Sequence, residues 1–318
     1  MILSVRDLRV SFRTEDGLVR VLDGVSFDLD AGEILGVVGE SGSGKTMSLL
    51  AIMGLITDPN AVIEGSIRYK GQEIVGLSAR RMQRLRGNEI AMIFQDPMTA
   101  LTPVYTIGWQ IAEQIRTHNR ISHAAALDRV EELLAEVNFP NPREALTRYP
   151  HQLSGGMRQR AVIAMALSCD PVLLVADEPT TALDVTVQAG ILDLVRKLRD
   201  THQSAVMFVT HDMGVVSELA DRVVVMYAGR IVERGSRQDV FSEPLHPYTR
   251  ALLGSIPPLT GAKPHRLPAI PGSPPSLLRL PKGCAFGPRC PVRFELCDEK
   301  PPLVGGSHAA ACFRVSAA

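Results

Sequence analysis

The sequence predicts an α/β protein that ends in a loop-rich extension, and three observations support this fold class. Apolar strand-like segments alternate with helical patterns between residues 172 and 227, which is the rhythm of a buried parallel sheet. A glycine-rich turn at residues 39–44 separates a short apolar segment from a helical one. The last 73 residues contain 13 of the 22 prolines, too many for long helices or central strands. For 318 residues, at roughly 150 residues per domain, we expect two units.

Charge and hydropathy exclude two classes of protein. The chain carries 34 basic and 34 acidic side chains, a net charge of +0, which argues against a generally basic nucleic-acid binder. No apolar run approaches the roughly 20 residues of a membrane span. Arg6 and Asp7 stand where a signal peptide needs an apolar core. We therefore expect a protein that acts in the cytosol and does not itself cross a membrane.

The charges and cysteines are distributed unevenly along the chain. Residues 246–318 hold nine Lys or Arg against three Asp or Glu, a net charge of +6, which leaves −6 for residues 1–245. Four of the five cysteines lie in the last 35 residues. Because this extension differs in kind from the body, we expect one domain at residues 1–245 and the extension at residues 246–318.

The first part of the chain predicts antiparallel strands, followed by a strand, a loop and a helix. Residues 3–12 and 18–29 alternate apolar and polar positions around a turn at Asp16-Gly17. Residues 34–38 are fully apolar, and residues 46–55 show helical spacing. This order places a glycine-rich loop between a buried strand and a helix.

The middle of the chain predicts a helical subdomain inserted into the α/β body, at about residues 96–160. Apolar residues recur at helical spacing from residue 105 to residue 138. The α/β pattern then resumes, with strands expected at 172–176, 205–209 and 223–227 and helices at 186–202 and 212–220.

Residues 39–46 match the phosphate-binding pattern G-x-x-x-x-G-K-[ST] in the strand-to-helix context that the pattern requires. Glycines let backbone N–H groups close around phosphates, Lys45 supplies positive charge, and the Thr46 hydroxyl can bind Mg²⁺. The alternative is a glycine-rich turn without a ligand. The candidate nucleotide-binding residues are Gly39, Ser41, Gly42, Ser43, Gly44, Lys45 and Thr46.

Two adjacent carboxylates follow the apolar segment 172–176. Ligands bind at the carboxyl ends of strands in open α/β sheets, so Asp177 suits the Mg²⁺ shell and Glu178 suits a general base for an attacking water. Alone, such a pair would ordinarily be solvated. Together with a phosphate loop, it indicates a nucleotide hydrolase.

Residues 153–160, Leu-Ser-Gly-Gly-Met-Arg-Gln-Arg, carry a resemblance to a known family. They are similar to the signature motif of the ATP-binding-cassette (ABC) ATPases, with Met157 where Gln is commoner. Ser154 is also a good N-cap, so its hydroxyl and the N–H groups at Gly155 and Gly156 would form an anion site with helix-dipole support. The alternative is that Ser154 only caps the helix.

Three further segments resemble motifs of the same family, in the family's order. Phe94-Gln95-Asp96-Pro97 resembles the Q-loop, Ala182-Leu183-Asp184 the D-loop, and Thr210-His211-Asp212 the switch histidine. The resemblance implies that Gln95 senses Mg²⁺ and the attacking water, that Asp184 belongs to the nucleotide site, and that His211 contacts the γ-phosphate. Phe12 stands where the family places an aromatic residue that stacks on adenine.

The family resemblance implies an architecture and an assembly. The fold would be an ABC-type nucleotide-binding domain with a RecA-like mixed sheet core, an antiparallel β subdomain and an inserted helical subdomain. In the family, ATP with Mg²⁺ lies between the phosphate loop of one subunit and the signature motif of the other. This implies a dimer with a second ABC ATPase subunit, a related heterologous one.

Segments of the extension resemble the dipeptide and oligopeptide importer branch of the family, namely residues 241–253, 270–275 and 283–291. This implies an ATPase bound peripherally at the cytoplasmic face of the membrane. Its partners would be two transmembrane permease subunits and, through the complex, an extracytoplasmic peptide-binding protein, with no nucleic acid. The alternatives are an importer of nickel, glutathione or another small solute, and a soluble ABC ATPase that acts on DNA or ribosomes.

The cysteines of the extension, Cys284, Cys290, Cys297 and Cys312, have the spacing C-x5-C-x6-C-x14-C. A cytosolic location disfavours disulfides. Structural zinc sites usually contain C-x2–4-C pairs, whereas four thiolates on wider loops can hold a [4Fe–4S] cluster. The branch resemblance also implies iron–sulfur, so we expect a [4Fe–4S] cluster, with zinc or no metal as the alternatives. The remaining cysteine, Cys169, is expected to be a small buried apolar residue.

Overall fold

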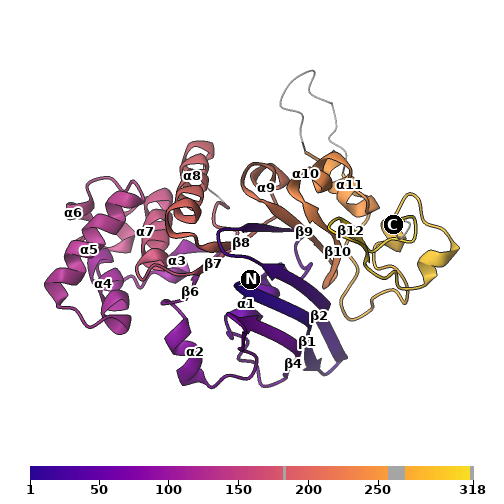
Figure 1. Cartoon of the computed structure of the whole chain (residues 1–318), viewed down its shortest axis with the longest axis horizontal. Helices are drawn as coiled ribbons and strands as arrows, with labels where there is room; N and C mark the ends of the chain where they lie inside the picture. Colours follow the sequence, from indigo (N-terminus) through magenta and orange to yellow (C-terminus); the bar gives the residue numbers. More distant parts are fainter. Residues whose placement is uncertain (182–183, 257–268, 316–318) are drawn as a thin grey trace. The chain divides into compact units, whose positions relative to one another are not determined.

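The computed structural model describes residues 1–181, 184–256 and 269–315, and the chain divides into two compact units (Figure 1). Unit 1 comprises Met1–Leu29, Ile34–Val75 and Phe208–Ala318, and unit 2 comprises Asp30–Glu33 and Gly76–Met207. The division falls inside strand β8 (Ala205–Thr210). Within the described ranges, no helix has both the length and the apolar character that crossing a membrane requires.

The N-terminal strands of unit 1 form an antiparallel sheet, as the alternating pattern predicts. The sheet has the order β2-β1-β4-β5, and Leu3 of β1 pairs with Leu29 of β2. Its inward-facing apolar side chains, among them Leu3 and Val25, are fully buried. The strands are β1 (Leu3–Thr14), β2 (Gly17–Leu29), β4 (Ala61–Tyr69) and β5 (Gln72–Glu73).

The other strands of unit 1 form a mixed sheet with the order β11-β12-β10-β9-β3. Strand β3 (Ile34–Val38) is buried along its whole length and runs parallel to β9 (Arg222–Tyr227), while β10 (Arg230–Ser236) is antiparallel to β9. This confirms the expected strands in this region and adds β10. The helices of this part are α1 (Lys45–Ile52), α9 (Met213–Leu219) and α10 (Arg237–Ser242).

The extension belongs to unit 1 and is loop-rich, as its prolines predict. The side chains of Tyr248 and Phe286 are buried in the same apolar cluster as Val225 and Tyr227 of β9, so the extension shares a core with the mixed sheet. Its elements are α11 (Pro247–Gly254), the 3₁₀ turns η2 (Gly287–Arg289) and η3 (Glu295–Asp298), and the short strands β11 (Val304–Gly305) and β12 (Ala309–Ala310).

Unit 2 contains a parallel strand pair and most of the helices. Strand β6 (Ile90–Ile93) pairs with β7 (Leu173–Asp177). The helical segment predicted around residues 105–138 is confirmed, because Ile107, Ile111 and Ile115 line one buried face of α4. The helices are α2 (Ala79–Leu85), α3 (Pro97–Ala100), α4 (Ile107–His118), α5 (His123–Glu136), α6 (Pro142–Ala145), the 3₁₀ turn η1 (Pro150–Gln152), α7 (Gly155–Leu167) and α8 (Val185–His202).

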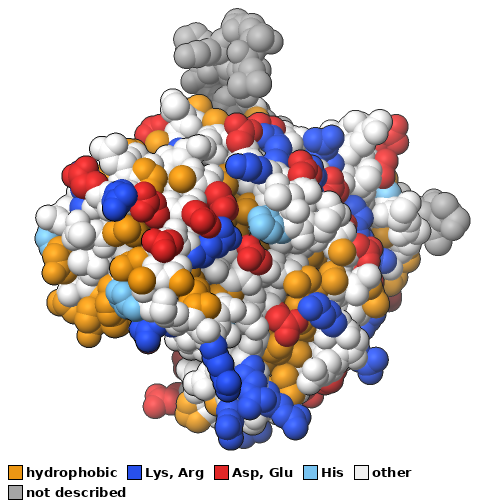
Figure 2. All heavy atoms as spheres, turned by 60° about the vertical axis from the view of Figure 1, so that its left-hand side comes forward, with side chains coloured by type: hydrophobic (Ala, Val, Ile, Leu, Met, Phe, Trp, Pro, Cys, Tyr) orange, Lys and Arg blue, Asp and Glu red, His pale blue; other side chains and the backbone are white. Residues whose placement is uncertain are grey.

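Positive and negative side chains are interspersed on the face shown in Figure 2, apart from a group of Lys and Arg side chains at its lower edge. In unit 2, the short helix α2 carries three exposed arginines, Arg80, Arg81 and Arg84, while Met82 on its other side is 3% exposed. Positive charge on this face is therefore local and does not form an extended basic surface.

Candidate functional site

The phosphate loop begins directly after strand β3. Gly39 has a φ of +152°, and a Cβ atom there would lie 2.2 Å from the carbonyl oxygen of Met226, so only glycine fits. Lys45 is 5% exposed, and its Nζ donates to the carbonyl oxygens of Gly39 at 2.8 Å and Glu40 at 3.1 Å. The loop thus holds its lysine on the inside, where a phosphate would be bound.

Two features of the loop fit a bound anion. Ser43 is 3% exposed, and among the described residues its Oγ has no hydrogen-bond partner. Helix α1 follows Gly44, whose φ of +102° is left-handed, and no side chain caps this helix. A buried hydroxyl and uncapped N–H groups are donors that a phosphate can satisfy.

The two carboxylates lie in unit 2, at the end of the fully buried strand β7. Asp177 is 3% exposed, and Glu178 is half-buried with a left-handed φ of +47°. The Gln95 amide nitrogen donates to Glu178 Oε2 at 3.2 Å, and the Thr181 hydroxyl donates to the same oxygen at 2.9 Å. Two residues assigned to one site from sequence, Gln95 and Glu178, are therefore in contact. Thr181 was not predicted.

The signature segment and Asp184 each begin a helix of unit 2. Ser154 Oγ accepts from the Met157 N–H at 3.3 Å and caps α7, as expected, and Ser154 and Gly155 are exposed. Asp184 Oδ1 accepts from the Val187 N–H at 2.9 Å and caps α8. Residues 182 and 183 of the predicted D-loop lie outside the described residues. Both motifs thus present exposed helix N-termini, while their roles toward nucleotide stay predictions.

The remaining predicted nucleotide contacts, His211 and Phe12, lie in unit 1. His211 is exposed and directly follows strand β8, and Asp212 caps α9 by accepting from the Gly214 N–H at 2.8 Å. Phe12 is half-buried in β1, where it is paired with Val19 of β2 and Ala61 of β4. Their assignments to the γ-phosphate and to adenine stay predictions.

The structure adds a group of contacts to the phosphate loop that the sequence did not suggest. The Glu40 carboxylate forms a bidentate ion pair with Arg289, at 2.6 Å to Nη1 and 3.0 Å to Nη2, and the Glu40 N–H donates to the Tyr248 hydroxyl at 2.8 Å. The hydrogen bonds that Arg289 donates to the Glu40 carboxylate raise the pKa of Arg289 above its ordinary value. Because 249 positions separate Glu40 from Arg289, no local pattern could have signalled the pair.

The four cysteines of the extension line one pocket in unit 1, together with Phe286, His246 and Phe294. All four are half-buried and form no disulfide. Burial raises the pKa of the Cys284 and Cys290 thiols, and the neighbouring Cys297 raises both further. Within the described residues, no three His, Cys, Asp or Glu side chains are arranged to hold a single metal ion. The cysteines thus surround one space without converging on one point.

His246 closes one side of the cysteine pocket and has a separate structural role. Its ring is 1% exposed, and its Nδ1 accepts from the Tyr248 N–H at 3.0 Å, which caps α11. Burial lowers the pKa of His246 to about 4. The ring is therefore neutral at physiological pH.

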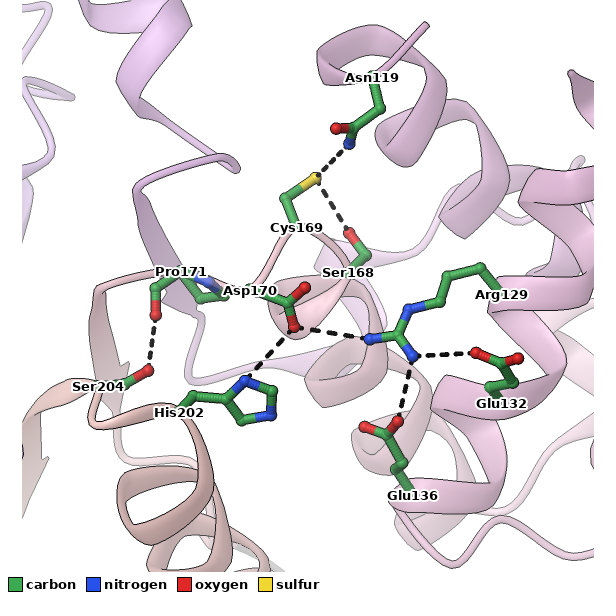
Figure 3. Close-up of polar contacts among 10 residues, drawn as sticks. All are labelled: Asn119, Arg129, Glu132, Glu136, Ser168, Cys169, Asp170, Pro171, His202 and Ser204. Atoms are coloured by element: carbon green, nitrogen blue, oxygen red, sulfur yellow. Dashed lines mark hydrogen bonds and ion pairs between the residues drawn. The ribbon is translucent and has the colours of Figure 1, made fainter. Parts of the chain in front are cut away.

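Cys169 lies in unit 2 and is not the buried apolar residue that we expected. It is half-buried, and its Sγ lies 3.8 Å from both the Asn119 amide nitrogen and the Ser168 hydroxyl (Figure 3). The next residue, Asp170, has a left-handed φ of +51° and pairs with Arg129 at 3.5 Å. Cys169 is thus part of a polar turn at the end of α7.

Two family models match the chain. The ABC transporter model matches residues 22–181, and the model of the oligopeptide/dipeptide transporter C-terminal region matches residues 232–297. The chain is 52% identical over 318 residues to the probable peptide ABC transporter ATP-binding protein y4tR of Sinorhizobium fredii, covering 99% of this chain and 95% of that protein. This chain belongs to the ABC transporter family. The ABC ATPase fold and ATP-hydrolysing activity expected from the motifs follow from that membership.

Other relatives and solved structures agree. The ABC ATPase is 49% identical to the oligopeptide transport ATP-binding protein OppD of Salmonella typhimurium, covering 99% of this chain and 94% of that protein. It is also 49% identical to the dipeptide transport ATP-binding protein DppD of Bacillus subtilis, covering 98% and 94%. The ATP-binding cassette MJ0796, in a dimeric post-hydrolysis state with ADP and Pi, matches with a TM-score of 0.68 and 25% identity over 74% of this chain and 99% of that one.

Proposed function

We propose that this ABC ATPase is the ATP-binding and ATP-hydrolysing subunit of an importer of dipeptides or oligopeptides. The observation that carries the proposal is the near-full-length identity to peptide transport ATP-binding proteins, which extends through the C-terminal region as well as the ATPase body. An ABC ATPase that shared only the body would leave the cargo open. The similarity of the extension favours peptides over nickel, glutathione or another solute.

Glu178 is the proposed general base of hydrolysis. Gln95 and Thr181 both donate to its Oε2, which orients the carboxylate at the end of β7. A carboxylate held in this way can accept a proton from a water that attacks the γ-phosphate. Because Gln95 touches the base directly, it is suited to sense the water and Mg²⁺.

Oxygen ligands for Mg²⁺ are available in the predicted residues. The Asp177 carboxylate, the Thr46 hydroxyl and the Gln95 amide oxygen are the hard donors that Mg²⁺ prefers. Mg²⁺ would neutralise charge on the phosphates during hydrolysis. Lys45 supplies the remaining positive charge of the phosphate loop, and we assign His211 to the γ-phosphate.

The signature segment is proposed to complete the nucleotide site of a second, related ATPase subunit. Its first residues, Ser154 and Gly155, are exposed at the N-terminus of α7, where N–H groups and the helix dipole favour an anion. Binding ATP would hold the two subunits together, and hydrolysis would remove the γ-phosphate contacts that keep them closed.

Exposed apolar side chains of unit 2 are suited to bind the permease subunits. Phe94 is 39% exposed, Val104 69%, Tyr105 45% and Trp109 40%, and the rings of Tyr105 and Trp109 stack with centroids 4.1 Å apart. Phe94 is next to Gln95 in the chain, so permease binding can influence the residue that contacts the general base. Two transmembrane permease subunits bound here would place the chain peripherally at the cytoplasmic face of the membrane, opposite an extracytoplasmic peptide-binding protein.

Reconstitution with the permease subunits tests the importer. In proteoliposomes that contain the complete complex, peptide-loaded binding protein should stimulate ATP hydrolysis, and the E178Q variant should abolish the stimulation. Stimulation by nickel or glutathione alone would contradict the peptide assignment. Binding to DNA or ribosomes instead of the permeases, at matched salt, would contradict the transporter.

The four cysteines of the extension are the proposed ligands of a [4Fe–4S] cluster. A zinc ion takes four sulfurs at about 2.3 Å from one point. A cluster instead takes one thiolate per iron, spaced around a common centre, which fits four cysteines that line one pocket. The bound cluster would order a segment that has little core of its own.

Anaerobic purification tests this cluster separately from transport. We expect about four iron atoms and about four sulfides per chain, with the absorption of a cluster, and loss of both in C297S. The C169S variant is the matched control, because Cys169 lies in unit 2, and it should keep the iron. Stoichiometric zinc, or a folded extension without metal, would show that the assignment is wrong.

A further inference from the structure

The phosphate loop is held from outside by the C-terminal extension. Glu40, the second residue of the loop, is hydrogen-bonded to the extension at two points. Its carboxylate accepts from Arg289 at 2.6 and 3.0 Å, and its N–H donates to the Tyr248 hydroxyl at 2.8 Å. The two extension residues come from different segments, η2 and α11. All of these residues lie in unit 1.

Arg289 is itself fixed, so it acts as a rigid clamp. Its side chain is 5% exposed, its Nε donates to the Pro271 carbonyl oxygen at 2.8 Å, and its Nη1 donates to the Tyr227 hydroxyl at 3.2 Å. The guanidinium lies 6.0 Å from the Phe286 ring centroid and 5.9 Å from that of Tyr227. A guanidinium held by this many partners loses little further freedom when it pairs with Glu40.

The charge on Glu40 makes this clamp relevant to nucleotide binding. Glu40 lies between Gly39 and the residues that close around phosphates. An unpaired carboxylate at this position would repel the negatively charged phosphates. Arg289 neutralises that carboxylate, and the Tyr248 hydroxyl accepts a hydrogen bond from the backbone amide of the same residue. Both effects favour the phosphate-binding form of the loop.

We propose that Arg289 and Tyr248 are positioning residues for ATP binding, through which the order of the extension sets nucleotide affinity. The proposal rests on the ATP-binding function of the phosphate loop. Arg289 lies in the turn between Cys284 and Cys290, where the Gly287 N–H donates to the Cys284 carbonyl oxygen at 2.9 Å. Whatever those cysteines bind therefore fixes the backbone that carries Arg289. Because coupling is reciprocal, ATP must in turn stabilise this turn.

A double-mutant cycle on the full-length chain tests the proposal, with a fluorescent non-hydrolysable ATP analogue as the probe. R289M should weaken binding about tenfold, within the usual range of coupling between sites, because it leaves the Glu40 carboxylate unpaired. E40Q combined with R289M should recover affinity to within about threefold of wild type. If Arg289 only stabilised the fold, the second substitution would not restore affinity. A double variant that binds as weakly as R289M would therefore overturn the proposal, and so would an R289M variant with wild-type affinity.

Two further variants guard against trivial outcomes. R293M removes an exposed arginine of the same segment, which pairs with Asp298 at 2.5 Å, and it should bind the analogue like wild type; a loss as large as that of R289M would overturn the specific role. If R289M does not fold, R289K and Y248F replace it, because both keep most of the packing. Each should weaken binding of the analogue about threefold; wild-type affinity in both would contradict the proposal.

Hydrogen exchange gives a readout that does not depend on affinity. The analogue should slow amide exchange at residues 284–290 in the wild-type chain and not in R289M. Unchanged exchange in the wild-type chain would contradict the reciprocal coupling. Failure of the wild-type chain to bind the analogue at all would instead refute the nucleotide-binding function itself, so the two failures are distinguishable.

Discussion

A buried carboxylate on β10 anchors the extension, and its neutralisation is the most direct test of that attachment. Glu233 is 0% exposed. Its Oε1 accepts from the Leu245 N–H at 2.8 Å and contacts His308 Nε2 at 2.8 Å, and its Oε2 accepts from the His246 N–H at 2.8 Å. One side chain thus holds two points of the extension, His246 and His308, and the residue just before it, Leu245.

The cost of E233Q follows from these contacts. Glutamine keeps one acceptor oxygen, but its NH₂ group cannot accept, so either the buried His246 N–H or the Leu245 N–H loses its acceptor. An unsatisfied buried donor costs about 1–3 kcal/mol, and the remaining bonds lose the strength that a charged acceptor gives. We expect a loss of about 3 kcal/mol in unfolding free energy, or a Tm lower by about 6–12 °C for a unit of this size.

Calorimetry and hydrogen exchange on the same samples check this expectation. Exchange should rise first at residues 245–248 and 308–312, and the Tm should fall. E243Q is the matched control, since Glu243 is an exposed acid of the same segment, and it should change stability by less than about 0.5 kcal/mol. An E233Q variant as stable as E243Q would refute the anchoring role of Glu233.

Three further predictions concern catalysis, pH and a turn. E178Q should reduce ATP hydrolysis about 10²–10⁴-fold with ATP binding retained, and wild-type turnover in the complete complex would show that Glu178 is not the base. Folding lowers the pKa of His246 from 6.5 to about 4. The folded state should therefore lose about 3 kcal/mol of stability as the pH falls from about 6.5 toward 4. The H246N variant can keep the helix cap and should flatten this pH dependence of the unfolding free energy; an unaltered profile would contradict the assignment. In denaturant unfolding, D170A should lower the free energy of unfolding by about 1–2 kcal/mol, and D170N by less than about 0.5 kcal/mol. Asn tolerates the left-handed φ, and the exposed ion pairs of Asp170 add little stability. Equal losses in the two variants would show that the charge of Asp170, rather than its backbone conformation, matters.

The elements that could be predicted are those whose own pattern fixes their burial. The apolar run 34–38 is β3 at the same bounds, and the segments 172–176 and 205–209 match β7 and β8 within a residue. Strand β10, by contrast, reads Arg-Ile-Val-Glu-Arg-Gly-Ser, which is too polar to signal a strand. It is stable because β9 and β12 pair with its two edges and because its buried Glu233 is hydrogen-bonded to His246 and His308 of the extension.

The predictable part of the candidate site is likewise its local part. The phosphate loop, the carboxylates after β7 and the caps at Ser154 and Asp184 each depend on a few neighbouring residues, so a motif can reveal them. Thr181 lies three residues from Glu178 and could have been found as a donor to it. The contacts of Glu40 with Tyr248 and Arg289 span 208 and 249 positions, and their partners are chosen by tertiary packing, which one sequence does not encode in a readable pattern.

The opposite net charges of the extension and the body are matched by ion pairs between them in unit 1. Basic residues of the extension pair with acids of the body, Arg289 with Glu40 and Lys300 with Asp23. Burial alone would raise the pKa of Asp23, but the hydrogen bond from Lys300 and the positive charges of Lys300, Arg230 and Arg20 lower it. Because Lys300 is 46% exposed and Arg289 only 5%, salt screens the first pair far more than the second. Attachment of the extension should therefore depend on buried contacts, such as the Arg289–Glu40 pair and those of Glu233, rather than on its net charge.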